Sequence, residues 1–565
     1  AYVDRNSLFP NGNLGNNPRM GVYNADNNQR ILIIDLPNNQ NGSGTANVVI
    51  PVPPGCVVPG LQQVNISVTD FTTIVNVPFS VNGYYLLYQT CCRSCATTNI
   101  DIDPATCGVQ GVQSNTPGNA YFGFIPSPIY QNSSPQFLDE AVPFICRGDT
   151  VTIANNATDP DGDKLIYSFI EPLDTRSNAG PPINFPTLGP VPYFPTFSAQ
   201  QPFGPGGVAE INPSTGLTKY MSPINGLFSI AIEIKEYRTL PNGIEILLSS
   251  TRREFAIVVR DCAPNNAPPN PNQPPGSTGN FTLVRTEGDS VVFNISTVDA
   301  EGDSVIIFVN SDIISGDNGF PAGATLATAP TVKGAGSATT TFSWKIDCGL
   351  TGGIVRSYPV NVRLEDRGCP PKVNNVIYTI IVNPFKAPAP ILGRDTICSN
   401  NRTQTFRVVT SAQSANLNWR VSNGTLLSSG IGDSVRVQWG ADTGTVRLIS
   451  TSGLGCKDSV SKLIKYSNAV PVNLNTSPFV CEGNNLTLSA TGGYSNFTWS
   501  NVTSDQNIGS GSAIVVSPTD TTRFAVSSRG NGCTVTDTVE VKWIPKIANA
   551  GPDTLSLCSG SFIQI

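Results

Sequence analysis

The chain has 565 residues, enough for about four to six domains, because a single hydrophobic core stops growing near ~250 to 300 residues. Charged residues make up 13% of the chain, roughly half of the share usual in soluble domains, and the net charge of −6 offers nothing to attract nucleic acid or an anionic membrane. Histidine is absent. Most hydrolase and metalloenzyme classes are thereby disfavoured, since histidine is the most frequent general base and a frequent zinc ligand.

Short alternating runs dominate the sequence and predict strands. TANVVIPV, QVNISVTDF, REFAIVVRD and NVIYTIIVN alternate apolar with polar residues, and 52 Gly and 46 Pro residues separate such runs. The predicted fold class is therefore all-β. No run approaches the ~18 apolar residues that span a bilayer. Because the chain opens on AYVDR and stops at GSFIQI, both strand-like, we expect a piece of a longer secreted polypeptide.

Two classes of internal repeat divide the chain. RGDTVTIANNATDPDGD and EGDSVVFNISTVDAEGD align without a gap, and Cys398, Cys481 and Cys558 follow one another at 83 and 77 residues, a period that suits one seven-stranded sandwich. The expected organisation is an N-terminal β-sandwich domain (1–136), a domain with the DPDGD loop (137–263), a stiff Pro- and Asn-rich linker (264–279), a domain with the DAEGD loop (280–386), two Ig/PKD-like repeats (387–470 and 471–547) and the start of a further repeat (548–565).

The cysteines are predicted to form disulfides in an oxidising compartment. The CCRSC segment lacks a second pair at zinc-finger spacing, and no alternation of strands and helices suits a thioredoxin-type site. Cys146 and Cys262 bracket a whole domain, and Cys348 and Cys369 could close a loop of intermediate length, although the sequence does not fix the connectivity. An odd number of cysteines lies in the N-terminal region: Cys56, Cys91, Cys92, Cys95 and Cys107.

The last two complete repeats each show the order Cys, Trp, Cys. Trp419 lies between Cys398 and Cys456, and Trp499 lies between Cys481 and Cys533. This order is typical of immunoglobulin-type sandwiches, in which a disulfide joins the two sheets and the indole packs on it. We therefore expect both tryptophans in cores. We expect the disulfide partner of Cys558 to lie beyond Ile565.

Several motifs, in order, resemble one family. GYYLLYQTCCRS, AYFGFIPSP, FICRGDTVTI, ATDPDGDKLIYSF, INPSTGLTKYMSPINGLFSIAIEIKEYR and RREFAIVVRDC together resemble the N-terminal region of very large secreted bacterial surface proteins. Those proteins carry a gliding-motility-associated C-terminal domain, are exported by the type 9 secretion system and are built from Ig-like and PKD-like repeats. The resemblance implies tandem Ig-like, cadherin-like and PKD-like sandwiches in an elongated multi-domain chain. It also implies a role as an adhesin, filament or appendage, such as the grappling-hook filaments of predatory bacteria.

The two aligned acidic turns are candidate calcium sites. Calcium takes six to eight oxygens, and closely spaced carboxylates around a glycine let one short loop wrap it. Such carboxylates repel one another and are costly without a cation or generous solvation. The candidate ligands are Asp159, Asp161 and Asp163 in the first turn, Asp299, Glu301 and Asp303 in the second, and Glu236 and Asp366 in the EYR and EDR segments. The last two follow from a resemblance to cadherin-like domains, whose loops take further oxygens from a neighbouring strand.

Two alternatives compete with calcium at these turns. Asp, Pro and Gly are also the residues of ordinary solvated turns. Paired carboxylates could in principle serve a glycosidase, which needs two carboxyl groups that face each other across ~5 to 9.5 Å. Acids on one turn diverge or crowd instead, so we expect no enzyme.

Together with this resemblance, the sequence leads us to expect an extracellular structural or adhesive protein at the cell surface, and the resemblance implies that it is part of a filament or appendage used for attachment, gliding or prey capture. Assembly as a homo-oligomer or filament is expected, and a surface glycan or protein ligand stays unidentified. No nucleic acid partner and no membrane span in this segment are expected. The alternative is a monomeric carbohydrate-binding or receptor-like ectodomain, which requires a concave site with exposed aromatic residues.

Overall fold

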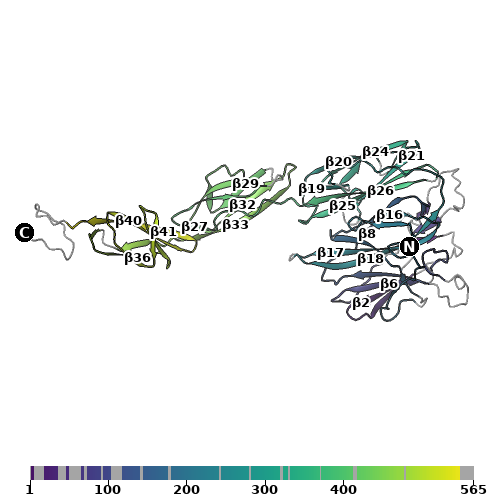
Figure 1. Ribbon diagram of the computed structural model, residues 1–565, viewed down its shortest axis with the longest axis horizontal. Coiled ribbons are helices and arrows are strands. Elements are labelled where there is room, and N and C mark those ends of the chain that lie inside the picture. Colours follow the sequence, from purple (N-terminus) through teal and green to yellow (C-terminus); the bar gives the residue numbers. More distant parts are fainter. Residues whose placement is uncertain are drawn as a thin grey trace, which may run out of the picture. The chain divides into compact units, whose positions relative to one another are not determined.

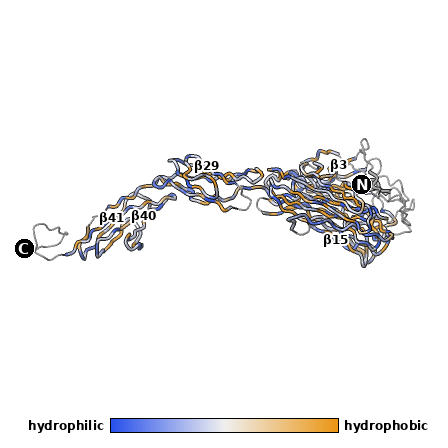
Figure 2. Tube along the Cα trace, turned by 90° about the horizontal axis from the view of Figure 1, so that it is seen from above, coloured by the Kyte–Doolittle hydropathy of each residue, from blue (hydrophilic) through white to orange (hydrophobic). Residues whose placement is uncertain are grey.

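The computed structural model describes residues 2–4, 18–35, 46–49, 65–68, 73–90, 93–102, 117–139, 144–175, 180–240, 243–278, 281–317, 322–328, 331–369, 371–410, 416–475 and 479–546. The chain forms two compact units, Ala1–Pro384 and Phe385–Ile565 (Figure 1). The predicted all-β class is confirmed, since the described elements are strands except for the four-residue helix α1 (Asp312–Ser315). Hydrophobic and hydrophilic residues alternate along the strands (Figure 2). No helix in the described part has the length and apolarity needed to cross a bilayer.

The N-terminal strands share a sheet with the strands that follow the expected boundary at residue 136. They are β1 (Tyr2–Asp4), β2 (Arg19–Asn24), β3 (Arg30–Asp35), β4 (Ala46–Val49), β5 (Asn65–Val68), β6 (Tyr84–Thr90), β7 (Asn119–Ile125) and β8 (Gln136–Phe137). β1, β5 and β4 make a small sheet. β3, β2, β6 and β7 instead continue through β18 (Glu245–Arg260) and β17 (Gly226–Thr239) to β12 (Lys164–Ile170) in one ten-stranded sheet.

The length of the β17–β18 hairpin explains this fused sheet. Its strands have 14 and 16 residues, whereas strands usually have about 5 to 6. A hairpin that long offers β18 as an unpaired edge, and β7 pairs with it at Phe124 opposite Ser250. In Figure 1, β17 and β18 accordingly have β2 and β6 on one side and the strands of the next domain on the other.

The first acidic-turn domain is a sandwich built on that hairpin. Its further strands are β9 (Phe144–Cys146), β10 (Val151–Ala154), β11 (Ala157–Thr158), β13 (Leu173–Asp174), β14 (Gly189–Pro190), β15 (Val208–Ile211) and β16 (Leu217–Met221). β10, β16 and β15 form the second sheet. Ile153 and Tyr220 from this sheet pack with Phe228 and Ile257 from the hairpin in one buried core.

The second acidic-turn domain is a sandwich of its own. Its strands are β19 (Thr282–Thr286), β20 (Ser290–Val298), β21 (Ser304–Asn310), β22 (Ala324–Leu326), β23 (Thr331–Ala335), β24 (Ser337–Lys345), β25 (Arg356–Asp366) and β26 (Val373–Asn383). One sheet has the order β19-β26-β25-β21-β23 and the other β20-β24-β22. Phe293, Phe342, Trp344 and Tyr378 fill the space between them.

The two acidic-turn domains lie side by side within the same unit. Asn156 donates to Asn361 Oδ1 (2.7 Å), and Asn361 donates in return to Asn156 Oδ1 (2.8 Å). The segment 264–279, expected to be a stiff spacer, packs against the second domain, where Asn374 in β26 donates to the carbonyl of Pro268 (3.0 Å). The buried Asn156–Asn361 pair fixes the two sandwiches to each other.

The second unit contains two sandwiches, on either side of residue 470. The first consists of β27 (Thr396–Cys398), β28 (Thr403–Arg407), β29 (Asn416–Ser422), β30 (Gly424–Leu426), β31 (Ser434–Trp439), β32 (Gly444–Thr451) and β33 (Lys457–Ser467). The second consists of β34 (Val472–Asn475), β35 (Phe479–Cys481), β36 (Leu486–Gly492), β37 (Phe497–Asn501), β38 (Gln506–Ser510), β39 (Ala513–Val516), β40 (Thr522–Gly530) and β41 (Cys533–Ile544). Trp419 and Trp499 are fully buried, so their predicted place in the cores is confirmed.

All four sandwiches share one topology, although the sequence shows two repeat classes. In each, the first strand pairs in parallel with the last: β9 with β18, β19 with β26, β27 with β33, and β35 with β41. Each first strand ends in the same turn, with hydrogen bonds from Asp149 to Cys146, Asp289 to Thr286, Asn401 to Cys398, and Asn484 to Cys481. The motifs around RGDT and around CSNN therefore encode the same turn.

This topology explains the disulfide between Cys146 and Cys262, whose Cα atoms are 5.5 Å apart. Cys146 lies opposite Arg260 in the pairing of β9 with β18, so the residue two positions after Arg260 lies beside it. At the corresponding position after β33 the chain has Ala469. Cys398 therefore has no such partner within its own repeat.

The expected disulfides within each Cys, Trp, Cys repeat are wrong. Cys398 lies opposite Ser467 at the end of β33, whereas Cys456 directly precedes this 11-residue strand. An extended strand of that length spans roughly 35 Å, and bonded cysteines need Cα atoms within about 7 Å. Cys398 instead bonds to Cys533 of the following repeat, with Cα atoms 5.6 Å apart. Cys456 and Cys481 are also disulfide-bonded.

Cys348 and Cys369 are both disulfide-bonded, but they do not close a loop together. Thr351, close after Cys348, donates to Glu287 at the end of the domain where β25 begins (2.8 Å), and Cys369 follows the opposite end of β25. Cys95 is disulfide-bonded as well. The remaining predicted disulfide cysteines (Cys56, Cys91, Cys92 and Cys107), Cys558 and the segment 548–565 lie outside the described residues.

Candidate functional site

The first acidic turn connects β11 to β12. Gly162 has φ +80°, a left-handed conformation that glycine adopts without a steric cost. The N–H of Asp163 donates to Asp159 Oδ1 (2.9 Å) and closes the turn. The pairing of β12 with β17 places Leu165 opposite Glu236. This register brings the predicted strand ligand, Glu236, to the turn.

Three of the predicted ligands converge at this turn. One carboxylate oxygen each from Asp159, Asp163 and Glu236 lies within 4.8 Å of the other two. Glu236 is fully buried and Asp159 is 6% exposed. Asp159 Oδ2 and Glu236 Oε1 are buried without a hydrogen-bond partner. Such oxygens are costly to bury, so the arrangement requires a proton or a cation.

The pKa values of Asp159 and Glu236 lead to the same conclusion. Burial raises the pKa of Glu236 from 4.5 to about 8, against the opposing hydrogen bonds from Ser249 and Asn132. Burial likewise raises the pKa of Asp159 from 3.8 to about 6, and the charges of Asp163 and Asp161 add to the shift. A cation would reverse both shifts, because it stabilises the ionised carboxylates.

The residues that surround the turn were not predicted from the sequence. The Arg238 guanidinium engages both oxygens of Asp163, at 2.9 and 3.1 Å from its Nε. Asn132 donates to Glu236 Oε2 (3.0 Å) and accepts from Arg238 (3.0 Å). Ser249 also donates to Glu236 Oε2. Arg238 could have been found, since it lies two residues after Glu236 and so on the same face of β17. Asn132 carries no such signal.

Asp161, the remaining predicted ligand of the first turn, lies outside the convergent group. Its side chain is 35% exposed, and its Oδ2 accepts the N–H of Ser133 (2.6 Å). The segment 131–133 therefore caps the turn of the domain that it leads into.

The second acidic turn repeats the closing hydrogen bond and the strand register of the first, but among the described residues only the acids of the first turn form a group of three carboxylates within 4.8 Å of one another. The N–H of Asp303 donates to Asp299 Oδ1 (2.6 Å), and the pairing of β21 with β25 places Val305 opposite Asp366. This repeats the register of the first turn, so Asp366 is the structural counterpart of Glu236. The alignment of the two acidic motifs thus holds in three dimensions.

In the second turn, too, a buried carboxylate oxygen lacks a hydrogen-bond partner. Asp366 is fully buried, Asp299 is 6% exposed, and Asp366 Oδ2 has no hydrogen-bond partner. Burial raises the pKa of Asp366, and the charge of Asp299 adds to the shift. Asn265 from the segment before the domain donates to Asp366 Oδ1 (2.9 Å), and Asn266 donates to the exposed Glu301. Sequence reasoning missed both asparagines.

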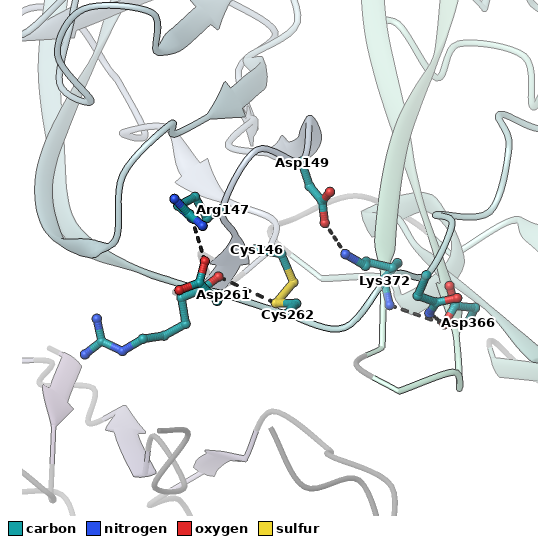
Figure 3. The surroundings of a disulfide bond; sticks show 9 residues. Cys146, Arg147, Asp149, Asp261, Cys262, Asp366 and Lys372 are labelled. Carbon is teal, nitrogen blue, oxygen red and sulfur yellow. Dashed lines mark hydrogen bonds and ion pairs between the residues drawn. A yellow bond between two sulfur atoms is a disulfide. The ribbon is translucent and has the colours of Figure 1, made fainter. Parts of the chain in front are cut away.

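A cavity of about 330 Å³ opens beside the second turn. Its polar lining comes from the disulfide, the linker and the turn, and includes Cys146, Asp149, Cys262, Asn266, Glu301 and Lys372. Figure 3 shows the Asp149–Lys372 ion pair between the disulfide and Asp366. The cavity gives solutes access to this face of the second turn.

The buried carboxylates argue against both alternatives. Ordinary solvated turns leave their acids in water, whereas Asp159, Glu236, Asp299 and Asp366 are at most 6% exposed. A glycosidase presents two carboxyl groups to a sugar in a cleft, and buried acids that converge on one another do not. Carboxylate and amide oxygens form the donor set that calcium prefers, so the residues present fit this ion.

The comparisons with known proteins agree with the fold. Residues 384–464 match the family described as PKD-like domain, which supports the predicted Ig/PKD-like repeat in this part of the chain. No curated protein matches the chain.

Three solved structures are similar to the chain at a low level. The human desmocollin-1 ectodomain is 11% identical, with 77% of this chain and 87% of that chain covered and a TM-score of 0.16. Fibronectin(III)-like modules of Clostridium thermocellum CbhA are 8% identical over 29% of this chain and 100% of that chain, with a TM-score of 0.20. Cadherin domains 3–6 of protocadherin gamma B2 are 13% identical over 73% and 100%, with a TM-score of 0.19. Likenesses this distant carry no argument about function.

Proposed function

We propose that this chain is a structural or adhesive surface protein, part of an extracellular filament or appendage used for attachment, gliding or prey capture. The observation that carries the proposal is the disulfide between Cys398 and Cys533, which joins neighbouring repeats. A bond between domains limits motion at their junction and transmits tension past the connecting residues. Disulfides persist in oxidising compartments, which supports an extracellular location.

Hydrogen bonds add to the same junction between the repeats. Asn400 donates to the carbonyl of Thr534 (3.2 Å), and the Tyr494 hydroxyl donates to the carbonyl of Asn468 (3.1 Å). The N–H of Ala469 in the connecting segment donates to Ser399 Oγ (2.8 Å). A junction held by covalent and hydrogen bonds suits a stiff fibre.

The placement of the tryptophans supports this proposal over a carbohydrate-binding ectodomain. A sugar site needs aromatic faces that line an open pocket. Trp344, Trp419, Trp439 and Trp499 are buried in cores, and Trp543 packs against the core of the last repeat. These side chains are engaged in packing.

Electron microscopy of the native assembly tests the proposal. We expect protomers that repeat along a fibre and carry this chain, identified by an antibody against it. Isolated flexible rods that bind defined sugars on a glycan array would contradict the fibre and favour the receptor-like ectodomain.

We also propose that calcium binds at the acidic turns. At a free calcium concentration 100 times the Kd, binding to the folded state alone adds about 2.7 kcal/mol to the free energy of unfolding. We therefore expect a chelator to lower the Tm of the first unit and added calcium to restore it. Magnesium, which holds its water more tightly, serves as the control. A Tm unchanged by chelator would contradict calcium binding.

A further inference from the structure

One position distinguishes the two acidic turns. Glu236 in β17 corresponds to Asp366 in β25 by register. The residue two positions farther is Arg238 in the first domain and Gly368 in the second. The first turn thus receives a guanidinium from a position where the second turn has no side chain.

Arg238 already neutralises part of the first turn. Its guanidinium occupies both oxygens of Asp163 and lies 3.7 Å from Asp161 Oδ2. In the convergent group, Asp159 Oδ2 and Glu236 Oε1 are the oxygens left without a partner. Calcium takes six to eight oxygens, so Arg238 leaves the first turn short of ligands as well as reduced in negative charge.

The second turn has no such internal cation. In the described part of the chain, no Lys or Arg forms an ion pair with its four acids, Asp299, Glu301, Asp303 and Asp366. Lys372 lies nearby but pairs with Asp149, as Figure 3 shows. The fully buried Asp366 keeps one oxygen, Oδ2, without a partner. A buried carboxylate oxygen without a partner is costly, and a cation beside it would remove this cost.

Gly368 also lets the linker reach the second turn. A Cβ at this position would lie 2.4 Å from Asn265 Nδ2 and 2.6 Å from Asp303 Oδ2, so a larger residue would displace the linker amide. The linker is held in place close by, because Cys262 is bonded to Cys146. The amide group of Asn265 is therefore fixed beside Asp303 and Asp366, with its Nδ2 donating to Asp366 Oδ1, and a rotation of this amide would present its oxygen, which is a calcium ligand in other proteins.

We propose that Arg238 is the resident cation of the first turn and that the second turn, with Gly368 in its place, is the one that requires a divalent cation. This inference rests on the proposed binding of calcium at the acidic turns and assigns the tight site. The first turn then needs no metal to hold its fold, whereas the second loses its order in chelator.

Calorimetric titration of calcium into the full disulfide-bonded chain tests the assignment. We expect Asp366→Asn to weaken the tightest binding at least tenfold and Asp159→Asn to leave it within twofold. Asp303→Asn, a change at a less buried ligand, should weaken it too if Asp366→Asn fails to fold. Arg238→Ala should create an additional binding event at the first turn. Arg19→Ala, which removes an exposed ion pair with Asp35, is the matched control and should change nothing.

The outcomes separate this inference from the calcium proposal. If wild-type chain binds no calcium, both fail. If both turns bind with equal affinity, or if Asp159→Asn abolishes the tight binding and Asp366→Asn does not, calcium binding stands and the assignment is overturned. An unchanged number of binding events in Arg238→Ala also overturns the role given to Arg238.

Discussion

Glu236 shows how the fold sets the chemistry of a single residue. Its segment, EYR, by itself predicts a strand with alternating faces, and the resemblance to cadherin-like domains made Glu236 a candidate ligand. Pairing with Leu165 turns its carboxyl group toward the acidic turn, and full burial then raises its pKa to about 8. In water this carboxyl group would be ionised at neutral pH, whereas in the folded chain it is stabilised either by a proton or by a bound cation.

Glu236→Gln should remove a pH dependence of stability. The pKa of Glu236 is raised in the folded state, from 4.5 to about 8, so the folded state holds this proton more tightly than the unfolded state. The resulting stabilisation is full below the lower value and is lost as the pH rises through the higher one. In chelator, we expect the Tm of wild-type chain to fall between about pH 5 and pH 8 and the Tm of the variant to fall less. A wild-type Tm that rises over this range would contradict the account.

Trp499→Ala should destabilise the last repeat strongly. The indole is fully buried and donates to the carbonyl of Gly511 (2.8 Å), so its removal leaves a large cavity at a cost of about 3 to 5 kcal/mol. Chemical denaturation followed by fluorescence or circular dichroism measures this cost. The control, Phe479→Ala, changes a side chain that is 49% exposed and should shift the free energy of unfolding far less. A cost for Trp499→Ala equal to that of the control would place the indole outside the core.

At the scale of strands, the alternation of apolar and polar residues was enough to predict the fold class. β20 is an example, since every second residue is buried and the residues between them are exposed or half-buried. The sequence could not predict that β7 pairs with β18, because that contact joins segments about 130 residues apart. It also depends on the unusual length of β18, which leaves part of the strand free to pair outside its own sandwich. The disulfide of Cys398 was missed for a similar reason. Spacing alone does not reveal that β33 holds Cys398 and Cys456 at opposite ends.

Asn361→Ala should weaken the contact between the two acidic-turn domains. Asn361 in β25 is 3% exposed and exchanges two hydrogen bonds with Asn156, which is 2% exposed. Its loss leaves a buried amide unsatisfied, at a cost of about 1 to 3 kcal/mol. Differential scanning calorimetry of the chain should show a lower or split transition. Asn294→Ala, at an exposed position of β20, is the control, and equal effects of the two changes would contradict the contact.

At the scale of the whole molecule, the acidic turns could be predicted in part. The ligands within the motif follow from spacing and those on the adjacent strand from the resemblance to cadherin-like domains, and the structure brings Asp159, Asp163 and Glu236 together. Asn132 and Asn265 come from segments that precede each domain, and only the folded chain shows that these segments return to the turns. The same holds for the link between repeats, which neither cysteine spacing nor composition reveals.

Peptide mass spectrometry under non-reducing conditions, on chain recovered from outside the cell with its free thiols blocked, tests the central claim most directly. The account predicts a cross-linked peptide that joins Cys398 to Cys533 and a second that joins Cys146 to Cys262. Blocked thiols at these positions, or a bond between Cys398 and Cys456, would contradict a chain of β-sandwiches stapled to one another in an oxidising compartment.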